Sequence, residues 1–358
     1  MRNAYAVSLC GSLIVLTLAA GCNRGDALVT SSTPSAVRHF ASTLAVTKYP
    51  LASVKSLCFN GRSWVVCYLT AAPHGITVGK DGALWFAQER YSCNTTFRPP
   101  QCTGAIGRIT TGGTLTEYAL NKTGAWGITA GPDGSLWFTE DVGKIGRITL
   151  AGTITEYATP SLNSSPTGIT AGPDGALWFL ESGATPRVGR STTAGQITEY
   201  PITTANSNPF TIASGSRALW FGEYGASKVG RITTSGKISD FSTPSHVSGP
   251  YGIARGADGA MWFTELFVNK IGRITSGGAI TEFPAGSGPS QITPGPDSQL
   301  WFSEGSTTSI GSISTLGAVT EYSLASGLYV TGIVNGPDGA LWISDDDPAG
   351  NAIARVQP

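Results

Sequence analysis

Residues 167–200 read TGITAGPDGALWFLESGATPRVGRSTTAGQITEY, and variants of this stretch recur along most of the chain. The tryptophan of its LWF core occurs seven times, at Trp85, Trp137, Trp178, Trp220, Trp262, Trp301 and Trp342. Successive tryptophans lie 39 to 42 residues apart, except for a first gap of 52. Self-similarity at such a period indicates an architecture of repeated supersecondary units.

Each repeat predicts four short strands. In 167–200, an apolar run at 168–170 leads into the turn Pro173-Asp174-Gly175, and residues 176–181 then alternate as a half-buried strand does. Two more strands are expected at 187–192 and 196–200, and no window has sustained helical periodicity. The pattern predicts an all-β fold, a seven-bladed β-propeller of four-stranded antiparallel blades. A solenoid of stacked sheets is the alternative, which would need capping repeats at both ends.

The chain divides into three predicted segments. Residues 1–22 contain Arg2 and an apolar run, and they end in a sequence that resembles a bacterial lipobox, in which Cys22 would be acylated; an ordinary signal peptide cut nearby is the alternative. Residues 23–43 are expected to be a flexible tether, and residues 44–358 the propeller. We therefore expect an extracytoplasmic lipoprotein that touches the membrane only through its lipid, or a secreted protein if Cys22 is not acylated.

The two ends of the propeller are out of phase with the repeat. Residues 46–50 match the fourth strand at 197–201 but have no first three strands before them, whereas the last repeat stops after its third strand, at 352–356. The N-terminal strand is therefore expected to complete the last blade, which leaves no open sheet edge.

Composition narrows the possible partners. The formal net charge is zero and 13% of the residues are charged, so the chain lacks the basic face that nucleic acids require. We expect a monomer that binds a small molecule or a cyclic peptide, and no nucleic acid.

Two long links carry the cysteines of the mature chain. Both links are expected to leave the same face of the first blade, which predicts a cap beside the channel. The spacing favours two local disulfides, Cys58 with Cys67 and Cys93 with Cys102, in an exported protein. A cross-link between the two insertions and a zinc site of four cysteines are the alternatives.

Two positions in each repeat are expected at the channel mouth, which is the default site. The position before the first strand holds His74, Trp126, Thr167, Phe210, Tyr251, Ser290 and Thr331. The end of the second strand holds Gln88, Glu140, Glu181, Glu223, Glu265, Glu304 and Asp345. These carboxylates either bind a cation or substrate, or pair with recurrent third-strand arginines at 108, 147, 190, 231, 273 and 355. The fourth-strand Glu117, Glu156, Glu199, Glu282 and Glu321 are expected to be solvated.

His74 is the strongest candidate for proton transfer, because it is one of three histidines and is expected beside Gln88 and Glu89. Its alternative role is that of an ordinary turn residue. No phosphate loop, zinc-protease pattern or Ser-His-Asp order is present.

The repeated GPDGxLWFTE, KIGRIT and ITEY motifs resemble those of the virginiamycin B lyase (streptogramin lyase) family, and the match covers residues 45–358. The resemblance implies a seven-bladed propeller. It also implies a carbon–oxygen lyase that opens the ester-closed ring of type B streptogramins by elimination with magnesium, using histidines before the GI of two successive late blades and a Glu past the WF of the last.

This sequence departs from the family at those positions, where it has Ser290, Thr331 and, in place of the Glu, Asp345 or a neighbour in Asp345-Asp346-Asp347. We therefore expect a ligand-binding or interaction module whose contacts include Trp126, Phe210, Tyr251, Ser290, Thr331, Gln88 and Glu304. The alternative is a magnesium-dependent lyase or lactone-opening enzyme in which His74 and Asp345, on neighbouring blades of the closed ring, are catalytic.

Overall fold

A computed structural model describes residues 41–51, 54–59, 64–69, 71–90, 104–121, 123–305, 308–347 and 350–358. The predicted signal peptide, Cys22, Cys93 and Cys102 lie outside these residues, as do the side chains of Cys58 and Cys67. The lipid anchor and both disulfides therefore stay predictions. Among the described residues, no helix is long and apolar enough to cross a membrane.

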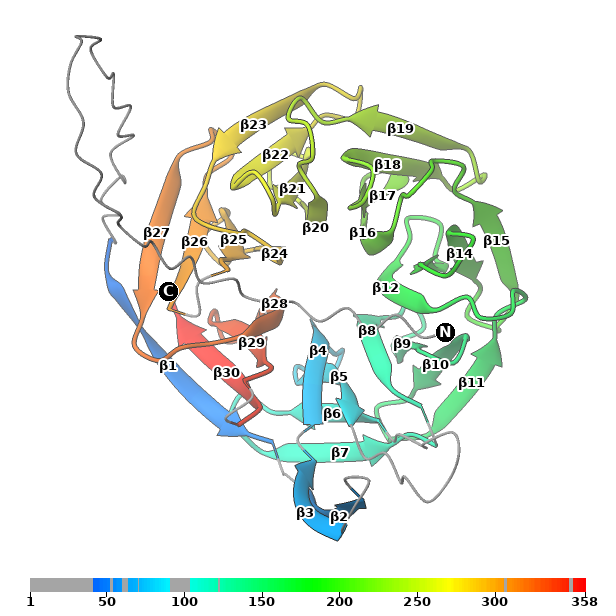
Figure 1. The fold of residues 1–358 in the computed structure, drawn as a ribbon, viewed down its shortest axis with the longest axis vertical. Coiled ribbons are helices and arrows are strands. Elements are labelled where there is room, and N and C mark those ends of the chain that lie inside the picture. Colours follow the sequence, from blue (N-terminus) through cyan, green and yellow to red (C-terminus); the bar gives the residue numbers. More distant parts are fainter. Residues whose placement is uncertain are drawn as a thin grey trace, which may run out of the picture. The chain divides into compact units, whose positions relative to one another are not determined.

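Five separate sheets each contain four consecutive antiparallel strands, which we call blades and name by their first strand (Figure 1). Blade β4 comprises β4 (Ala71–Val78), β5 (Leu84–Arg90), β6 (Ala105–Ile109) and β7 (Leu115–Ala119). Blade β8 comprises β8 (Ala125–Ala130), β9 (Leu136–Glu140), β10 (Lys144–Ile148) and β11 (Ile154–Ala158). Blade β12 comprises β12 (Pro166–Ala171), β13 (Leu177–Glu181), β14 (Arg187–Ser191) and β15 (Ile197–Pro201). Blade β16 comprises β16 (Pro209–Ser214), β17 (Ala218–Glu223), β18 (Lys228–Thr233) and β19 (Ile238–Ser242). Blade β20 comprises β20 (Pro250–Arg255), β21 (Met261–Glu265), β22 (Lys270–Ile274) and β23 (Ile280–Pro284).

An eight-stranded sheet holds the two remaining blades, joined through β1 (Thr43–Pro50). Blade β24 comprises β24 (Ile292–Pro294), β25 (Leu300–Ser303), β26 (Ser309–Ile313) and β27 (Val319–Leu324). Blade β28 comprises β28 (Val330–Asn335), β29 (Leu341–Asp345), β30 (Ala352–Gln357) and β1. The first strands contact one another in a cycle, from β4 through β8, β12, β16, β20 and β24 to β28 and back to β4. The predicted all-β propeller class is thus confirmed.

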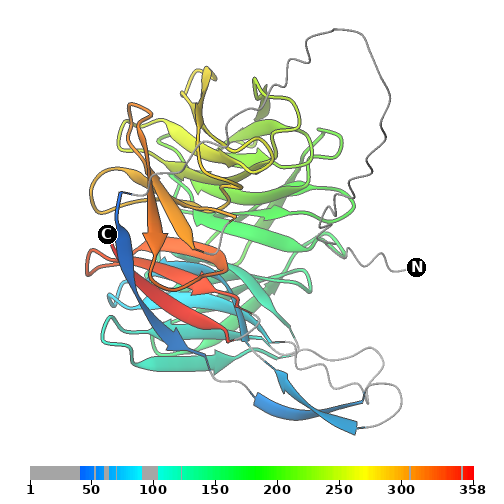
Figure 2. The same ribbon diagram turned by 60° about the vertical axis from the view of Figure 1, so that its left-hand side comes forward.

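The N-terminal strand closes the ring as expected. Residues 45–50 of β1 pair antiparallel with β30, from Ala45 opposite Gln357 to Pro50 opposite Ala352. The start of β1 also pairs in parallel with β27, at Thr43 and Leu44. Figure 2 shows this blue strand beside the red β30. Both ends of the propeller therefore share one sheet, and the edge of β30 is covered.

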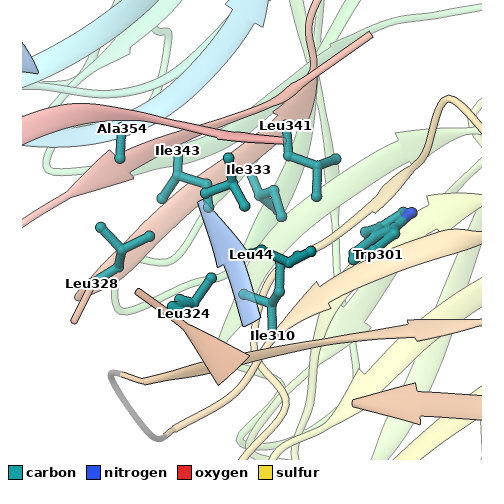
Figure 3. Packing of buried hydrophobic residues seen from close by; sticks show 10 residues of the cluster. Leu44, Trp301, Ile310, Leu324, Leu328, Ile333, Leu341, Ile343 and Ala354 are labelled. Atoms are coloured by element: carbon teal, nitrogen blue, oxygen red, sulfur yellow. The ribbon is translucent and has the colours of Figure 1, made fainter. Parts of the chain in front are cut away.

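The hydrophobic core lies between neighbouring blades. Trp85, for example, packs with Phe138 of the next blade, and the corresponding cluster around Leu44 joins blades β24 and β28 (Figure 3). The recurrent tryptophans are buried, as predicted, with at most 4% of their surface exposed. The third-strand glycine is required by this packing, because a Cβ on Gly146 would lie 2.1 Å from the ring of Phe138.

The first long link contains a hairpin of β2 (Val54–Phe59) and β3 (Trp64–Leu69), which pair only with each other among the described strands. Its register places Cys58 opposite Val65 and Cys67 opposite Ser56. The hairpin is a sheet separate from the blades. Whether it belongs to a cap stays a prediction, because the second insertion lies outside the described residues.

Candidate functional site

The residues that were expected before the first strands do meet around one cavity, although six of them lie within the first strands and only Ser290 precedes its strand. His74, Trp126, Thr167, Phe210, Tyr251, Ser290 and Thr331 all line a cavity of about 550 Å³. Six of the seven first strands have an irregular register next to these positions, for instance between Pro166 and Ile169. The repeat therefore places one variable side chain from every blade on the cavity wall.

Glycines after these positions let the first strands approach one another closely. A Cβ on Gly127 would lie 2.6 Å from the carbonyl oxygen of Thr167, and one on Gly252 would lie 2.3 Å from that of Ser290. Any larger residue would push the neighbouring strands apart. The GI motif of the repeat thus sets the width of the cavity.

His74 lies against Trp126 at the cavity wall. The two rings stack with centroids 4.1 Å apart and an angle of 19° between their planes. The Nε2 atom of His74 is buried and has no hydrogen-bond partner among the described residues, and the nearest carboxylate oxygen, Oε2 of Glu89, is 3.7 Å away. Asp346 adds a second acid to this sector; burial raises its pKa, while the nearby His74 lowers it.

A second aromatic group lies on blades β16 and β20. The ring of Phe210 is 5.6 Å from that of Tyr251, and Tyr224 packs edge-on against both. Tyr224 also contacts Phe267, which is 53% exposed. These four side chains extend an aromatic surface from the cavity to the solvent.

The hydroxyl groups of Ser290 and Thr331 already have partners. Ser290 Oγ lies 2.7 Å from Ser303 Oγ, and Thr331 Oγ1 donates to the backbone carbonyls of Pro73 and Ser344. Among the described residues, none of these hydrogen-bond partners is a basic side chain. These side chains shape the cavity wall.

The second set of predicted residues does not face the cavity. Gln88, Glu304 and Asp345 are at most 5% exposed and belong to the blade interiors. Asp345 ends its strand as predicted, Glu304 directly follows its strand, and Gln88 lies two residues before the end of its own. The second strand lies one strand further out than the first, whose residues line the cavity. Asp345 is held by Lys48 of β1, whose Nζ is 2.8 Å from Oδ2, and by the backbone N–H of Tyr329.

The buried second-strand acids face acids of the outer strand. Burial, followed by repulsion from this second acid, raises the pKa to about 7 for Glu140, Glu181, Glu223 and Glu265. The outer partners are Glu156, Glu199, Asp240 and Glu282, so the expectation that this outer-strand position is solvated is wrong for Glu199 and Glu282, whose side chains are 10% and 8% exposed. A third-strand cation completes each group, as Lys270 does, 2.6 Å from Glu282.

Two of the three blades without the third-strand cation differ in the acids too, whereas blade β24 keeps Glu304, to which Ser309 in the place of the cation donates a hydrogen bond. In blade β4 the cation is replaced by Ala105, and the acid by Gln88, whose Nε2 donates to Glu117. In blade β28, Ala352 lies opposite Asp345, and Lys48 supplies the charge from the fourth strand instead. Outside blade β24, the second-strand acids are therefore either grouped with a cation of their own blade or, in blade β4, replaced by an amide.

The recurrent arginines pair with the turn aspartates and not with the second-strand acids, which corrects that expectation. In five blades the aspartate accepts a hydrogen bond of 2.9 to 3.1 Å from the tryptophan Nε1 and one of 2.6 to 2.8 Å from the arginine Nε. We call this arrangement the Asp–Trp–Arg clamp. Its aspartates are Asp81, Asp133, Asp174, Asp258 and Asp338. Although burial acts in the opposite direction, these bonds lower the pKa of each aspartate.

Sequence reasoning did not identify Tyr224 or Leu266 as site residues, and it named Asp346 only as an alternative to Asp345 at the Glu position of the family. Each directly follows a second-strand acid, and Leu266 lines the cavity. The sequence could have indicated them, because all three occupy the same position of the repeat, one residue after the second-strand acid.

The residues at the cavity do not fit the magnesium site that the resemblance implies. Ser290 and Thr331 offer hydroxyls that are already hydrogen-bonded, and Asp345 is buried against Lys48. Among the described residues, no group of three or more His, Cys, Asp or Glu side chains is placed to hold a metal ion.

The model of the virginiamycin B lyase family matches residues 62–218 and 213–358. A structure described as a streptogramin B lyase is 31% identical, with 88% of this chain and 97% of the other covered and a TM-score of 0.74. Virginiamycin B lyase from Staphylococcus aureus is 38% identical, covers 80% of this chain and 95% of its own, and has a TM-score of 0.71. Its catalytically inactive histidine-to-alanine variant, solved with quinupristin, is 36% identical over 86% and 99% of the chains, with a TM-score of 0.71. No curated protein matched.

Proposed function

The chain belongs to the virginiamycin B lyase family, and from that premise we propose that it is a ligand-binding member, which holds a cyclic peptide or a similar ring-bearing small molecule in the cavity. The observation that carries the proposal is the cavity wall. Aromatic side chains from blades β8, β16 and β20 line it, and the family's late-blade histidine positions hold Ser290 and Thr331.

The lining indicates the chemistry of the ligand. Among the described residues that line the cavity, His74 is the only histidine, and none is a carboxylate, lysine or arginine. Trp126 is 37% exposed and already stacks on His74, so it presents a flat face. Such a wall favours an uncharged ligand with an apolar or aromatic ring.

Quinupristin is a suitable first probe, because it occupies the variant of the S. aureus enzyme. We expect isothermal titration calorimetry to detect binding to the purified protein. Trp126→Ala should weaken it by about ten-fold through the loss of one stacking face. Leu316→Ala is the matched control, because Leu316 is 92% exposed and does not line the cavity. The absence of heat with quinupristin and with a panel of other cyclic peptides would falsify the proposal.

A second function is favoured by one observation, the unpartnered Nε2 of His74 at the cavity wall. In an elimination, this nitrogen would accept a proton from the carbon next to the ester-bearing carbon. The electron pair left behind would form a C=C bond as the carbon–oxygen bond breaks, leaving a carboxylate. Glu89 and Asp346 would stabilise the imidazolium.

The same quinupristin samples decide between the two functions. If the protein only binds, mass spectrometry after long incubation with magnesium present should find quinupristin intact in the cyclic form. A linear product that His74→Gln abolishes, while Leu316→Ala still forms it, would establish the lyase function instead. The His74→Gln variant keeps a hydrogen-bonding side chain of similar length but removes the base.

We further propose that the protein is exported and anchored by a lipid on Cys22, which the lipobox-like sequence ending at this cysteine supports. Expression in a bacterial host should place the full-length chain in the membrane fraction and label it with radioactive palmitate. Cys22→Ser should lose the label. A soluble periplasmic wild-type protein without label would show that the segment is an ordinary signal peptide.

A further inference from the structure

Blade β16 lacks the acid of the Asp–Trp–Arg clamp. Four residues before its tryptophan, Trp220, the chain has Ser216 where the five clamped blades have aspartate. The turn is also one residue shorter, with Gly215 N donating to the carbonyl of Ala218. Arg231 nevertheless keeps its place, with its guanidinium carbon 5.5 Å from the ring centre of Trp220, close to the 5.8 Å seen at three clamps.

Two donors of blade β16 lack the acceptor that the aspartate supplies in the five clamped blades. The Nε atom of Arg231 is buried and has no hydrogen-bond partner among the described residues. The indole Nε1 of Trp220 likewise donates to no acceptor in that part of the chain, whereas five equivalent indoles donate to an aspartate. A buried guanidinium donor without an acceptor is costly.

Blade β24 shows that a missing clamp partner can be replaced from within the chain. There the arginine position holds Ser312, and the amide Nε2 of Gln299 donates to Asp297 Oδ2 at 2.8 Å. Asp297 still accepts from Trp301. A lost cation is therefore compensated in blade β24, but no acid among the described residues replaces the lost anion in blade β16.

A cavity of about 470 Å³ opens at this place, at the end of the first strands opposite the cavity around His74. Its lining includes Arg231 and Trp220, the exposed Ser216 and Arg217 of the shortened turn, and Ser276. None of the described residues that line it is acidic. Two guanidinium groups and an indole N–H thus line the space that corresponds to the aspartate carboxylate of the five clamped blades.

We propose that this cavity binds a small oxyanion, a carboxylate or phosphate group, in the position of the missing aspartate side chain. One oxygen accepts from Trp220 Nε1 and a second from Arg231 Nε, as the two oxygens of Asp174 do in blade β12. Arg217 supplies additional positive charge from the solvent side. The planar, fixed donors of arginine suit this two-point recognition.

The experiment measures the thermal unfolding midpoint while sodium phosphate or sodium acetate replaces sodium chloride at constant ionic strength. The wild-type midpoint should rise saturably with at least one oxyanion, since a ligand that binds only the folded state stabilises it. The phosphate and acetate arms show which oxyanion is preferred. Arg231→Gln should abolish the rise.

Two further variants make the test specific. Arg190→Gln changes the equivalent arginine of a complete clamp and should leave the anion response as in the wild type. Ser216→Asp restores the acid at an exposed turn position, so it should raise the midpoint in chloride and remove the anion response, and it serves if Arg231→Gln does not fold. A wild-type protein that responds to neither oxyanion, or an equal response in wild type and Ser216→Asp, overturns the proposal.

Discussion

At the scale of single residues, the buried acids of the second strands make stability depend on pH. The pKa of Glu265 rises from 4.5 to about 7 on folding, so the folded state holds a proton that the unfolded state has lost between these values. The stabilising contribution is complete below pH 4.5 and is lost as the pH rises through 7. The side chain of Glu265→Gln cannot ionise, so the variant does not lose this contribution. The free energy of unfolding of the variant minus that of wild type should therefore be about 2 kcal/mol larger at pH 8 than at pH 5.

Glu282, the outer-strand partner of Glu265, provides a control in which stability should change with pH in the opposite direction. Burial acts to raise the pKa of Glu282, but hydrogen bonds from Lys270 and Ser245 lower it further than burial raises it. Its stabilisation is present above pH 4.5 and is lost as the pH falls, so Glu282→Gln should destabilise at pH 7 and less so in acid. Denaturant titrations from pH 4 to pH 8 measure both effects. Parallel curves for wild type and Glu265→Gln would contradict the assignment.

At the scale of elements, β1 contributes charge as well as hydrogen bonds to the last blade. Lys48 of β1 neutralises Asp345, which has no exposed side-chain surface. Lys48→Met leaves a buried carboxylate without its cation, and we expect a loss of about 2 to 3 kcal/mol at pH 7, since Lys48 is itself a quarter exposed. Adding Asp345→Asn should recover at least half of the loss, because the amide oxygen still accepts from Tyr329 N.

The exposed Lys80 gives a matched control. Lys80→Met removes the same charge from the surface and should change the free energy of unfolding by about 0.5 kcal/mol or less. Chemical denaturation of the four proteins measures these differences. Equal effects of Lys48→Met and Lys80→Met would show that the ion pair with Asp345 does not stabilise the blade.

At the scale of the whole molecule, one strand decides whether the ring is closed. Without β1, the backbone groups of β30 from Ala352 to Gln357 lose their partners, and Leu44 leaves the cluster between blades β24 and β28. A chain that starts at Leu51 should unfold at a markedly lower temperature than one that starts at Ala41, and it should aggregate through the open edge. Size-exclusion chromatography and thermal unfolding of the two chains make the comparison. A monomeric, equally stable shorter chain would show that closure does not depend on β1.

Several features of the fold could be predicted because the same sequence pattern occurs in every repeat. The spacing of the tryptophans predicted the blades, and the match of residues 46–50 to a fourth strand predicted the pairing of β1 with β30. The side chains around the cavity could be predicted for the same reason. Equivalent residues of equivalent blades lie at the same height and distance from the channel, so His74, Trp126 and Tyr251 had to meet there.

Only the tertiary structure decided where the charged side chains pair. Sequence position placed Glu265 at the channel end of its strand, and it placed Arg190 beside a second-strand acid. The structure turns Glu265 into the blade toward Glu282, and it pairs Arg190 with the turn residue Asp174. The reason is that strand order gives the end of the sheet on which a residue lies but not its depth from the channel. A charge is paired with whichever opposite charge shares its depth and its side of the sheet, and these depend on how the blades pack.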